Sequence, residues 1–168
     1  MPLIHNIIEG DWPQVDAIQK EAYPPQAIED IQTIIYHWKL SPDTCFVATM
    51  DNSVIAYLSA HPWKMRIQPP INTIYSIIEN PNCIYIHDIS INKQYQKTGL
   101  GQKLASKLFE TGANLGYSSY CLISVQGTRS FWENLGFNHV TDLPDGYFSN
   151  IVNLYPDSPY YYMEKPNI

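Results

Sequence analysis

The chain has 168 residues, of which 45% are hydrophobic and 13% aromatic, and its formal net charge at pH 7 is −6. This length and composition predict one globular domain over residues 1–168 and argue against disorder. The acidic balance argues against nucleic acid as a partner, because duplex binding depends on Lys and Arg neutralising phosphates. It would attract a cationic small molecule such as a protonated amine.

The first half of the chain predicts, in order, a strand, two helices and a hairpin of two strands: 3–8, 12–22, 28–38, 45–50 and 54–60. Asp11 is expected to cap the first helix, and Pro24-Pro25 ends it. Asp51-Asn52-Ser53 is a hairpin signal. A Pro-rich irregular segment over residues 62–81 follows, and connections of this length are often functional.

The second half predicts strands alternating with helices: a strand over 84–91, a helix from the following turn to about 115, a strand over 120–125, a helix over 129–135, and strands over 137–140 and 160–164. Gly136 is expected to end the fourth helix. Strand–helix–strand alternation beside a hairpin predicts a mixed α/β sheet with helices on its faces.

Three features bear on where the protein resides. Cys45, Cys83 and Cys121 lack C-x-x-C spacing, which indicates buried free thiols in a reducing compartment. The N-terminus lacks the basic start and apolar region of a signal peptide. No apolar run approaches the roughly 18 residues that predict a spanning helix. We expect a cytoplasmic protein without a membrane partner and without a metal site.

The turn Gln96-Lys97-Thr98-Gly99-Leu100-Gly101 connects the strand over 84–91 to a helix. A strand that delivers glycines to a helix N-terminus exposes backbone N–H groups to an anion, and the helix dipole favours negative charge. Four of the ten basic residues fall within fifteen positions here: Lys93, Lys97, Lys103 and Lys107. The plainer interpretation is a turn that needs positive φ at Gly99 or Gly101, with solvated lysines on an exposed helix.

Two separated motifs resemble the GNAT superfamily of N-acetyltransferases. Its acetyl-CoA signature, Q/R-x-x-G-x-G/A after the fourth strand, is matched by Gln96, Gly99 and Gly101, and its aromatic helix ending in G-F is matched by residues 131–137. The resemblance implies a single-domain, mixed, mostly antiparallel sheet flanked by helices, with strands four and five splayed apart. Within this superfamily, the chain resembles bacterial members near the arylalkylamine N-acetyltransferases. Three segments carry this closer resemblance: I-H-D-I, Val125-Gln126-Gly127 and Phe131-Trp132.

The resemblance also implies how acetyl-CoA binds as co-substrate. The pyrophosphate would lie on the backbone N–H groups of residues 97–102, and the pantetheine arm would pair with the edge of the fourth strand. The expected cofactor-binding residues are Ile89, Ser90, Ile91, Gln96, Lys97, Thr98, Gly99, Leu100, Gly101, Gln102, Ser124, Gln126, Phe131 and Trp132.

His87 and Tyr85 are the candidates for the base that accepts the amine proton. They lie two residues apart on a strand and so share a face, and histidine has a suitable ordinary pKa near 6.5. The alternatives are a core imidazole and a core tyrosine. Asp88 is expected to be structural and bonded to a backbone N–H, on the opposite face unless a bulge intervenes. Trp132 stands where many family members carry a tyrosine that protonates CoA, so Tyr147 or Tyr160–Tyr162 are substitutes.

The sequence thus predicts an N-acetyltransferase that moves acetyl from acetyl-CoA to a small aryl or alkyl primary amine, by direct attack in a ternary complex. Two alternatives stay open. One is acetylation of a protein N-terminus or lysine, and the other is an acyl-CoA-binding sensor without turnover. Dimerisation is frequent in the family, so a homodimer is a further expectation, without a particular interface.

Overall fold

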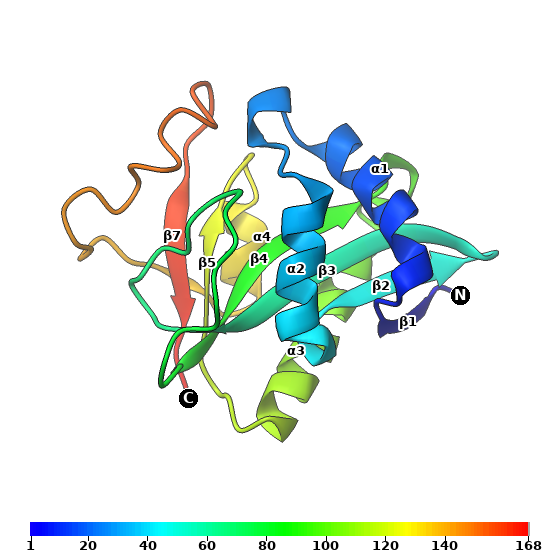
Figure 1. Cartoon of the computed structure of the whole chain (residues 1–168), viewed down its shortest axis with the longest axis horizontal. Helices are drawn as coiled ribbons and strands as arrows, with labels where there is room; N and C mark the ends of the chain where they lie inside the picture. Colours follow the sequence, from blue (N-terminus) through cyan, green and yellow to red (C-terminus); the bar gives the residue numbers. More distant parts are fainter. Residues whose placement is uncertain (168) are drawn as a thin grey trace.

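A seven-stranded sheet with the order β1-β2-β3-β4-β5-β7-β6 organises the chain (Figure 1). The computed structural model describes residues 1–167. The strands are β1 (Leu3–Asn6), β2 (Phe46–Met50), β3 (Ser53–Trp63), β4 (Cys83–Ile91), β5 (Tyr120–Ser124), β6 (Asn138–His139) and β7 (Tyr161–Lys165). Only the β4–β5 pair is parallel among the described strands. This confirms the predicted mixed, mostly antiparallel sheet.

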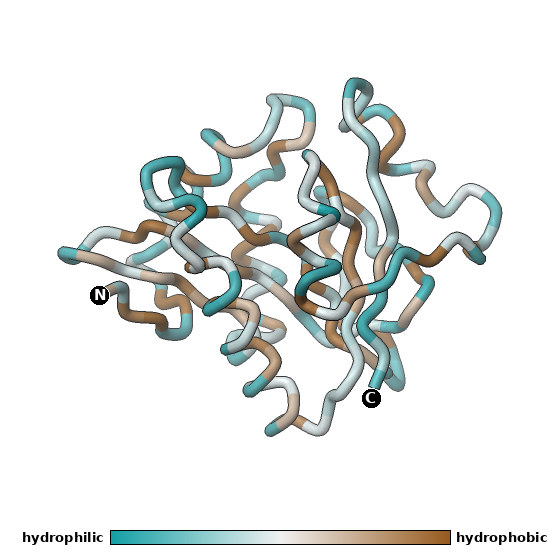
Figure 2. Tube along the Cα trace, turned by 180° about the vertical axis from the view of Figure 1, so that it is seen from behind, coloured by the Kyte–Doolittle hydropathy of each residue, from teal (hydrophilic) through white to brown (hydrophobic). Residues whose placement is uncertain are grey.

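Helices cover both faces of the sheet. Figure 1 shows α1 (Trp12–Ala22) and α2 (Ile31–Leu40) in front of the strands and α3 (Leu100–Asn114) behind them, with the short α4 (Arg129–Asn134) beside β5. Alternate residues of β2 and β3 face opposite layers, as a period of two requires. Val47 and Tyr57 pack with α1 and α2, whereas Phe46 and Leu58 pack with α3. In Figure 2 the apolar stretches follow the strands, and the loop tips are mostly hydrophilic.

Several details differ from the sequence prediction, most by one or two residues at the ends of elements. The second helix begins at Ile31, because the Asp30 carboxylate accepts the Gln32 N–H at 2.8 Å and caps it there. Asp11 does not cap α1, since its carboxylate accepts the Ile8 N–H at 2.9 Å instead. β3 continues to Trp63, which pairs with Cys83 and shortens the irregular segment. The strand expected over 137–140 is reduced to the two residues of β6.

The two central strands separate at their far ends, as expected. β4 and β5 pair only between residues 84–86 and 120–122. Beyond Ile86, β4 runs on to Ile91 while pairing with β3 alone. The separation opens the sheet at the N-terminus of α3 and positions the site. Within residues 1–167, no helix is long and apolar enough to cross a membrane.

Candidate active site

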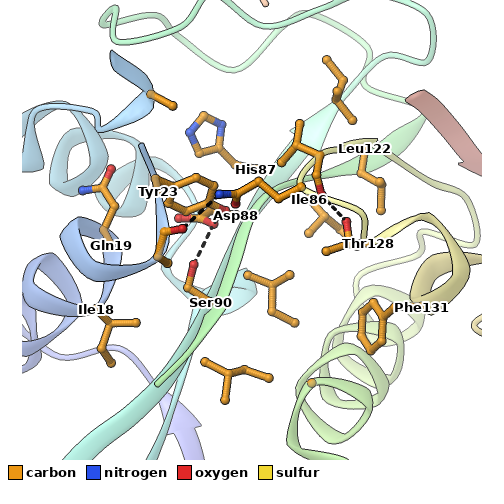
Figure 3. A pocket seen from close by; sticks show the side chains of 18 of the residues that line it. Ile18, Gln19, Tyr23, Ile86, His87, Asp88, Ser90, Leu122, Thr128 and Phe131 are labelled. Atoms are coloured by element: carbon orange, nitrogen blue, oxygen red, sulfur yellow. Dashed lines mark hydrogen bonds between the residues drawn. The ribbon is translucent and has the colours of Figure 1, made fainter. Parts of the chain in front are cut away.

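A cavity of about 850 Å³ lies where β4 and β5 separate. Residues 85–91 of β4 form one wall, and Leu122, Val125 and Gln126 belong to the opposite one. Figure 3 shows Tyr23 and Asp88 on one side, with Thr128 and Phe131 across from them. The Gln126 side chain donates to the carbonyl oxygen of Ala22 at 3.1 Å, which links the second wall to the end of α1. The cavity therefore extends from the glycine turn to the connection between α1 and α2.

The glycine turn has the geometry of an anion site. Gly99 adopts φ +81° immediately before α3, and Lys97 also has positive φ, at +61°. The first N–H groups of a helix have no intrahelical acceptor. Among the described residues, none of the backbone N–H groups from 97 to 102 donates to a backbone or side-chain oxygen. These groups fit the phosphates of a bound nucleotide-type ligand at the cavity's end.

Most of the residues expected to bind the cofactor line this cavity. It is bordered by Ile89, Ser90, Ile91, Gln96, Lys97, Gly99, Leu100, Gly101, Gln102, Gln126, Phe131 and Trp132. Two of the expected residues do not border it. The Thr98 hydroxyl donates to the Tyr95 carbonyl at 2.6 Å, and the Ser124 side chain is buried, 3.0 Å from the Thr128 hydroxyl.

A β-bulge in β4 determines where its polar side chains point. Ala60 pairs with Ile86 and Ser59 pairs with Asp88, so His87 is the extra residue. The bulge brings Asp88 to the side of Tyr23 and Tyr57, whereas regular alternation would have pointed it away from His87. The sequence carries the signal, because isoleucines occupy even positions at 84 and 86 but odd positions at 89 and 91. The apolar alternation changes phase across His87-Asp88.

Asp88 is held by side chains rather than by the backbone N–H that was expected. Its carboxylate accepts hydrogen bonds from the hydroxyls of Tyr23 and Tyr57, and the Ser90 hydroxyl lies 3.3 Å away. Burial raises the pKa of Asp88, and the two tyrosine bonds only partly oppose this effect. A buried carboxylate with this many donors joins α1, β3 and β4 into one polar wall.

Sequence reasoning missed the partner of His87, which is Glu29. The His87 Nε2 contacts the Glu29 carboxylate, although the two residues are 58 positions apart. The Glu29 N–H donates to the Gln19 side-chain oxygen at 2.8 Å, and the carboxylate accepts the Asn72 N–H at 2.7 Å. Glu29 lies in the irregular connection between α1 and α2, where no motif marks it.

Charge within the site is concentrated on this pair. Burial disfavours the imidazolium, but the Glu29 carboxylate outweighs it and raises the pKa of His87 to about 9. Burial also disfavours the charged form of Glu29 and acts to raise its pKa, yet His87 lowers the pKa of that carboxyl below its ordinary value. At pH 7 the pair is therefore an ion pair. Burial raises the pKa of Tyr85 well above 10, so its phenol keeps its proton.

Two further histidines lie beside His87. Its ring centroid is 6.5 Å from those of both His37 and His61. Burial and the charge of His87 lower the pKa of His37 to about 4 and that of His61 to about 3, so both are neutral at pH 7. Within residues 1–167, no group of three or more His, Cys, Asp or Glu side chains has a metal-binding arrangement.

Trp132 is a packed core residue as well as part of the cavity wall. It is 4% exposed, and its ring meets Phe131 and Phe137 edge-on at centroid distances of 4.8 and 5.4 Å. The tyrosines considered as substitute acids, Tyr147 and Tyr160–Tyr162, do not border the cavity. Tyr155 borders it instead, on the side of Glu29 and Asp88.

The model of the acetyltransferase (GNAT) family matches residues 4–137, and the chain belongs to this family. A curated relative, "Uncharacterized N-acetyltransferase YkwB" of Bacillus subtilis (strain 168), is 23% identical over 120 residues, which are 64% of this chain and 53% of that protein. The chain thus spans about half the length of the curated relative that it matches.

Solved structures share the fold over almost the whole chain. Arabidopsis thaliana Naa50, in complex with the bisubstrate analogue CoA-Ac-MVNAL, has a TM-score of 0.72 and 12% identity, with 98% of both chains covered. The GphF GNAT-like decarboxylase in complex with isobutyryl-CoA has a TM-score of 0.80 and 10% identity, covering 97% of this chain and 98% of that one. At these identities the likeness establishes the fold alone.

Proposed function

We propose that the protein transfers the acetyl group of acetyl-CoA to the nitrogen of a small aryl or alkyl primary amine. One observation carries the proposal: a single cavity joins the free N–H groups at the start of α3 to the polar wall of Glu29, His87 and Asp88. CoA phosphates suit the first end, and a protonated amine suits the acidic second end.

The pantetheine arm is assigned to the unpaired edge of β4. Residues 87–91 do not pair with β5, and their strand borders the cavity along its length. A peptide-like arm can pair with such an edge as an added strand does. The thioester would then reach the gap between β4 and the loop of Gln126. Holding both substrates there supplies on the order of 7–11 kcal/mol at best.

In the reaction, the amine nitrogen attacks the thioester carbonyl, the C–N bond forms and the C–S bond breaks. The amine gives a proton to a base, and CoA leaves with the electrons of the C–S bond. His87 is the proposed base because it lines the cavity beside the expected acceptor position. Tyr85 stays protonated and is proposed only as a hydrogen-bond donor near the reacting groups.

The shape of the acceptor end supports a small molecule. The Gln26 side chain donates to the Leu154 carbonyl at 3.0 Å and joins the α1–α2 connection to the C-terminal loop. A recess of about 370 Å³ lies beyond this contact and shares Ala27, Glu29, Ile71 and Leu154 with the main cavity.

The likeness to Naa50 with its peptide-containing analogue favours a second candidate, acetylation of a peptide N-terminus.

The test is amine-dependent CoA release from acetyl-CoA, measured for the wild type, His87→Ala and Gly99→Asp. We expect turnover with a small aryl or alkyl amine, and its loss in Gly99→Asp, whose side chain would stand at φ +81° in the phosphate turn. Turnover with peptides but with none of the amines would favour the second candidate. Binding of acetyl-CoA without turnover in either panel would contradict transfer and indicate a sensor.

A further inference from the structure

Glu29 is fixed in place before any substrate binds. Its backbone N–H donates to the Gln19 side-chain oxygen, and its carbonyl accepts from the Gln19 side-chain nitrogen at 3.3 Å. One carboxylate oxygen accepts the Asn72 N–H, and the other contacts His87 Nε2. Only 11% of the Glu29 side chain and 14% of the His87 side chain is exposed. Contacts on every side leave the carboxylate one orientation, aimed at the imidazole.

The second ring nitrogen of His87 is buried and lacks a partner. Within residues 1–167, Nδ1 makes no hydrogen bond, whereas Nε2 is held by Glu29. Buried polar atoms are nearly always paired, so an unpaired one calls for an explanation. A carboxylate on Nε2 favours the tautomer with hydrogen on that nitrogen, which leaves the lone pair on Nδ1. His87 lines the cavity, so we assign this lone pair, present when the ring is neutral, as the acceptor of the substrate's proton.

We propose that Glu29 is a positioning residue that holds the Nε2 hydrogen of His87, so that Nδ1 takes the proton released by the acceptor amine. The proposal rests on the proposed transferase function and adds the residue that orients its base. As the C–N bond forms and the C–S bond breaks, one amine proton moves to Nδ1. The sulfur leaves as thiolate, and Glu29 stabilises the imidazolium that forms.

The groups around His87 determine its charge. The carboxylates of Glu29 and Asp88 raise the pKa of His87, while burial opposes them. The neighbouring rings of His37 and His61 are neutral at pH 7. Tyr75 and Tyr85 complete the surroundings, and burial raises the pKa of both phenols, so neither is charged at pH 7. Glu29 contacts only the ring of His87 among the three imidazoles.

The pH dependence follows from this arrangement. A base must be unprotonated, and the pKa of His87 is raised to about 9, so kcat/KM should rise with pH toward that value. Glu29→Gln removes the main charge that raises this pKa, and burial then favours the neutral ring. The rising part of the profile should move to lower pH by about two units. With a weaker and less well oriented base, kcat/KM on the plateau should fall about 100-fold.

The deciding experiment is an NMR pH titration of the histidine rings in the whole protein, with His87 assigned through His87→Gln. We expect hydrogen on Nε2 in the neutral form and a pKa well above 6.5, lowered in Glu29→Gln. Glu79→Gln removes the same charge from an exposed loop position and should leave His87 unchanged. If Glu29→Gln does not fold, Glu29→Asp takes its place. Aspartate keeps the charge, but its shorter side chain moves the carboxylate away from the His87 ring.

Rates against pH for the same variants and one amine complete the test. A lowered His87 pKa together with a shifted rate profile supports the proposal. A lowered pKa without a shifted profile would overturn the role of Nδ1 as proton acceptor, and an ordinary or Glu29-independent pKa would overturn the pairing itself. A folded wild type that acetylates no amine would contradict the proposed function and the catalytic role together, while the titration would still decide whether Glu29 controls His87.

Discussion

The ring of Phe131 occupies the space beside Gly101 where any other residue would carry a side chain. A Cβ placed on Gly101 would lie 3.2 Å from Cζ of Phe131 and 3.1 Å from Cδ1 of Ile91. The two sequence motifs, the glycine turn and the aromatic helix, therefore contact each other in the folded chain. This contact lets the start of α3 approach α4 where both line the cavity.

Gly101→Ala should weaken acetyl-CoA binding more than it weakens the fold. The methyl group forces the Phe131 ring to shift toward the cavity, where it competes with the cofactor. We expect about a tenfold higher Kd for acetyl-CoA by calorimetry. The free energy of unfolding should change little, because alanine gains about 1 kcal/mol of helix propensity over glycine. Gly10→Ala, which meets open space, is the control. An unchanged Kd would contradict a role for this contact at the site.

Gly112→Ala should destabilise the fold without reaching the site. Its Cβ would lie 2.3 Å from the Tyr120 hydroxyl and 2.9 Å from Cδ1 of Ile84, both between α3 and the sheet. Overpacking of this kind costs about 1–3 kcal/mol, which denaturant unfolding would measure. Adding Tyr120→Phe removes the closest atom and should restore part of the loss. No restoration in the double variant would show that the crowding lies elsewhere.

Acid should destabilise the protein through His37 and His61. Their pKa values are lowered to about 4 and about 3 in the folded chain, compared with about 6.5 in an unfolded chain. The unfolded state therefore binds more protons as the pH falls from about 6.5 to 4. The free energy of unfolding should drop by roughly 1.4 kcal/mol per histidine and pH unit. Urea unfolding at several pH values measures this effect. The free energy of unfolding of His37→Gln should depend less steeply on pH than that of the wild type. Parallel pH dependences of the two proteins would show that His37 does not contribute.

Gln26→Ala should affect the acceptor amine and not the cofactor. The lost hydrogen bond to the Leu154 carbonyl frees the C-terminal loop from the α1–α2 connection. We expect the KM for the amine to rise about fivefold, a typical loss for one hydrogen bond, with an unchanged KM for acetyl-CoA. Gln32→Ala, on the exposed side of α2, is the matched control. An equal rise in both KM values would place the acceptor elsewhere.

Local pattern was sufficient for the order of elements and for placing the glycine turn at the start of α3. Gly99 and Gly101 stand between an apolar strand and a helical pattern, and the conformation of this turn depends on neighbours in the chain. Family membership and the fold are confirmed, while acetyl-CoA as the co-substrate belongs to the proposed function. The roles of His87 and Tyr85 remain proposals, since they depend on a substrate that residue spacing does not identify.

The amino-acid sequence by itself determined the class of protein, because motifs that bind a cofactor through the backbone are short and contiguous. Only the tertiary structure decided which polar groups come together at the cavity. Glu29 meets His87 across 58 positions, and Asp88 meets Tyr23 across 65, through a bulge that re-aims the strand. Such contacts depend on sheet register and on the path of an irregular connection, and neither is encoded in the periodicity of any one segment.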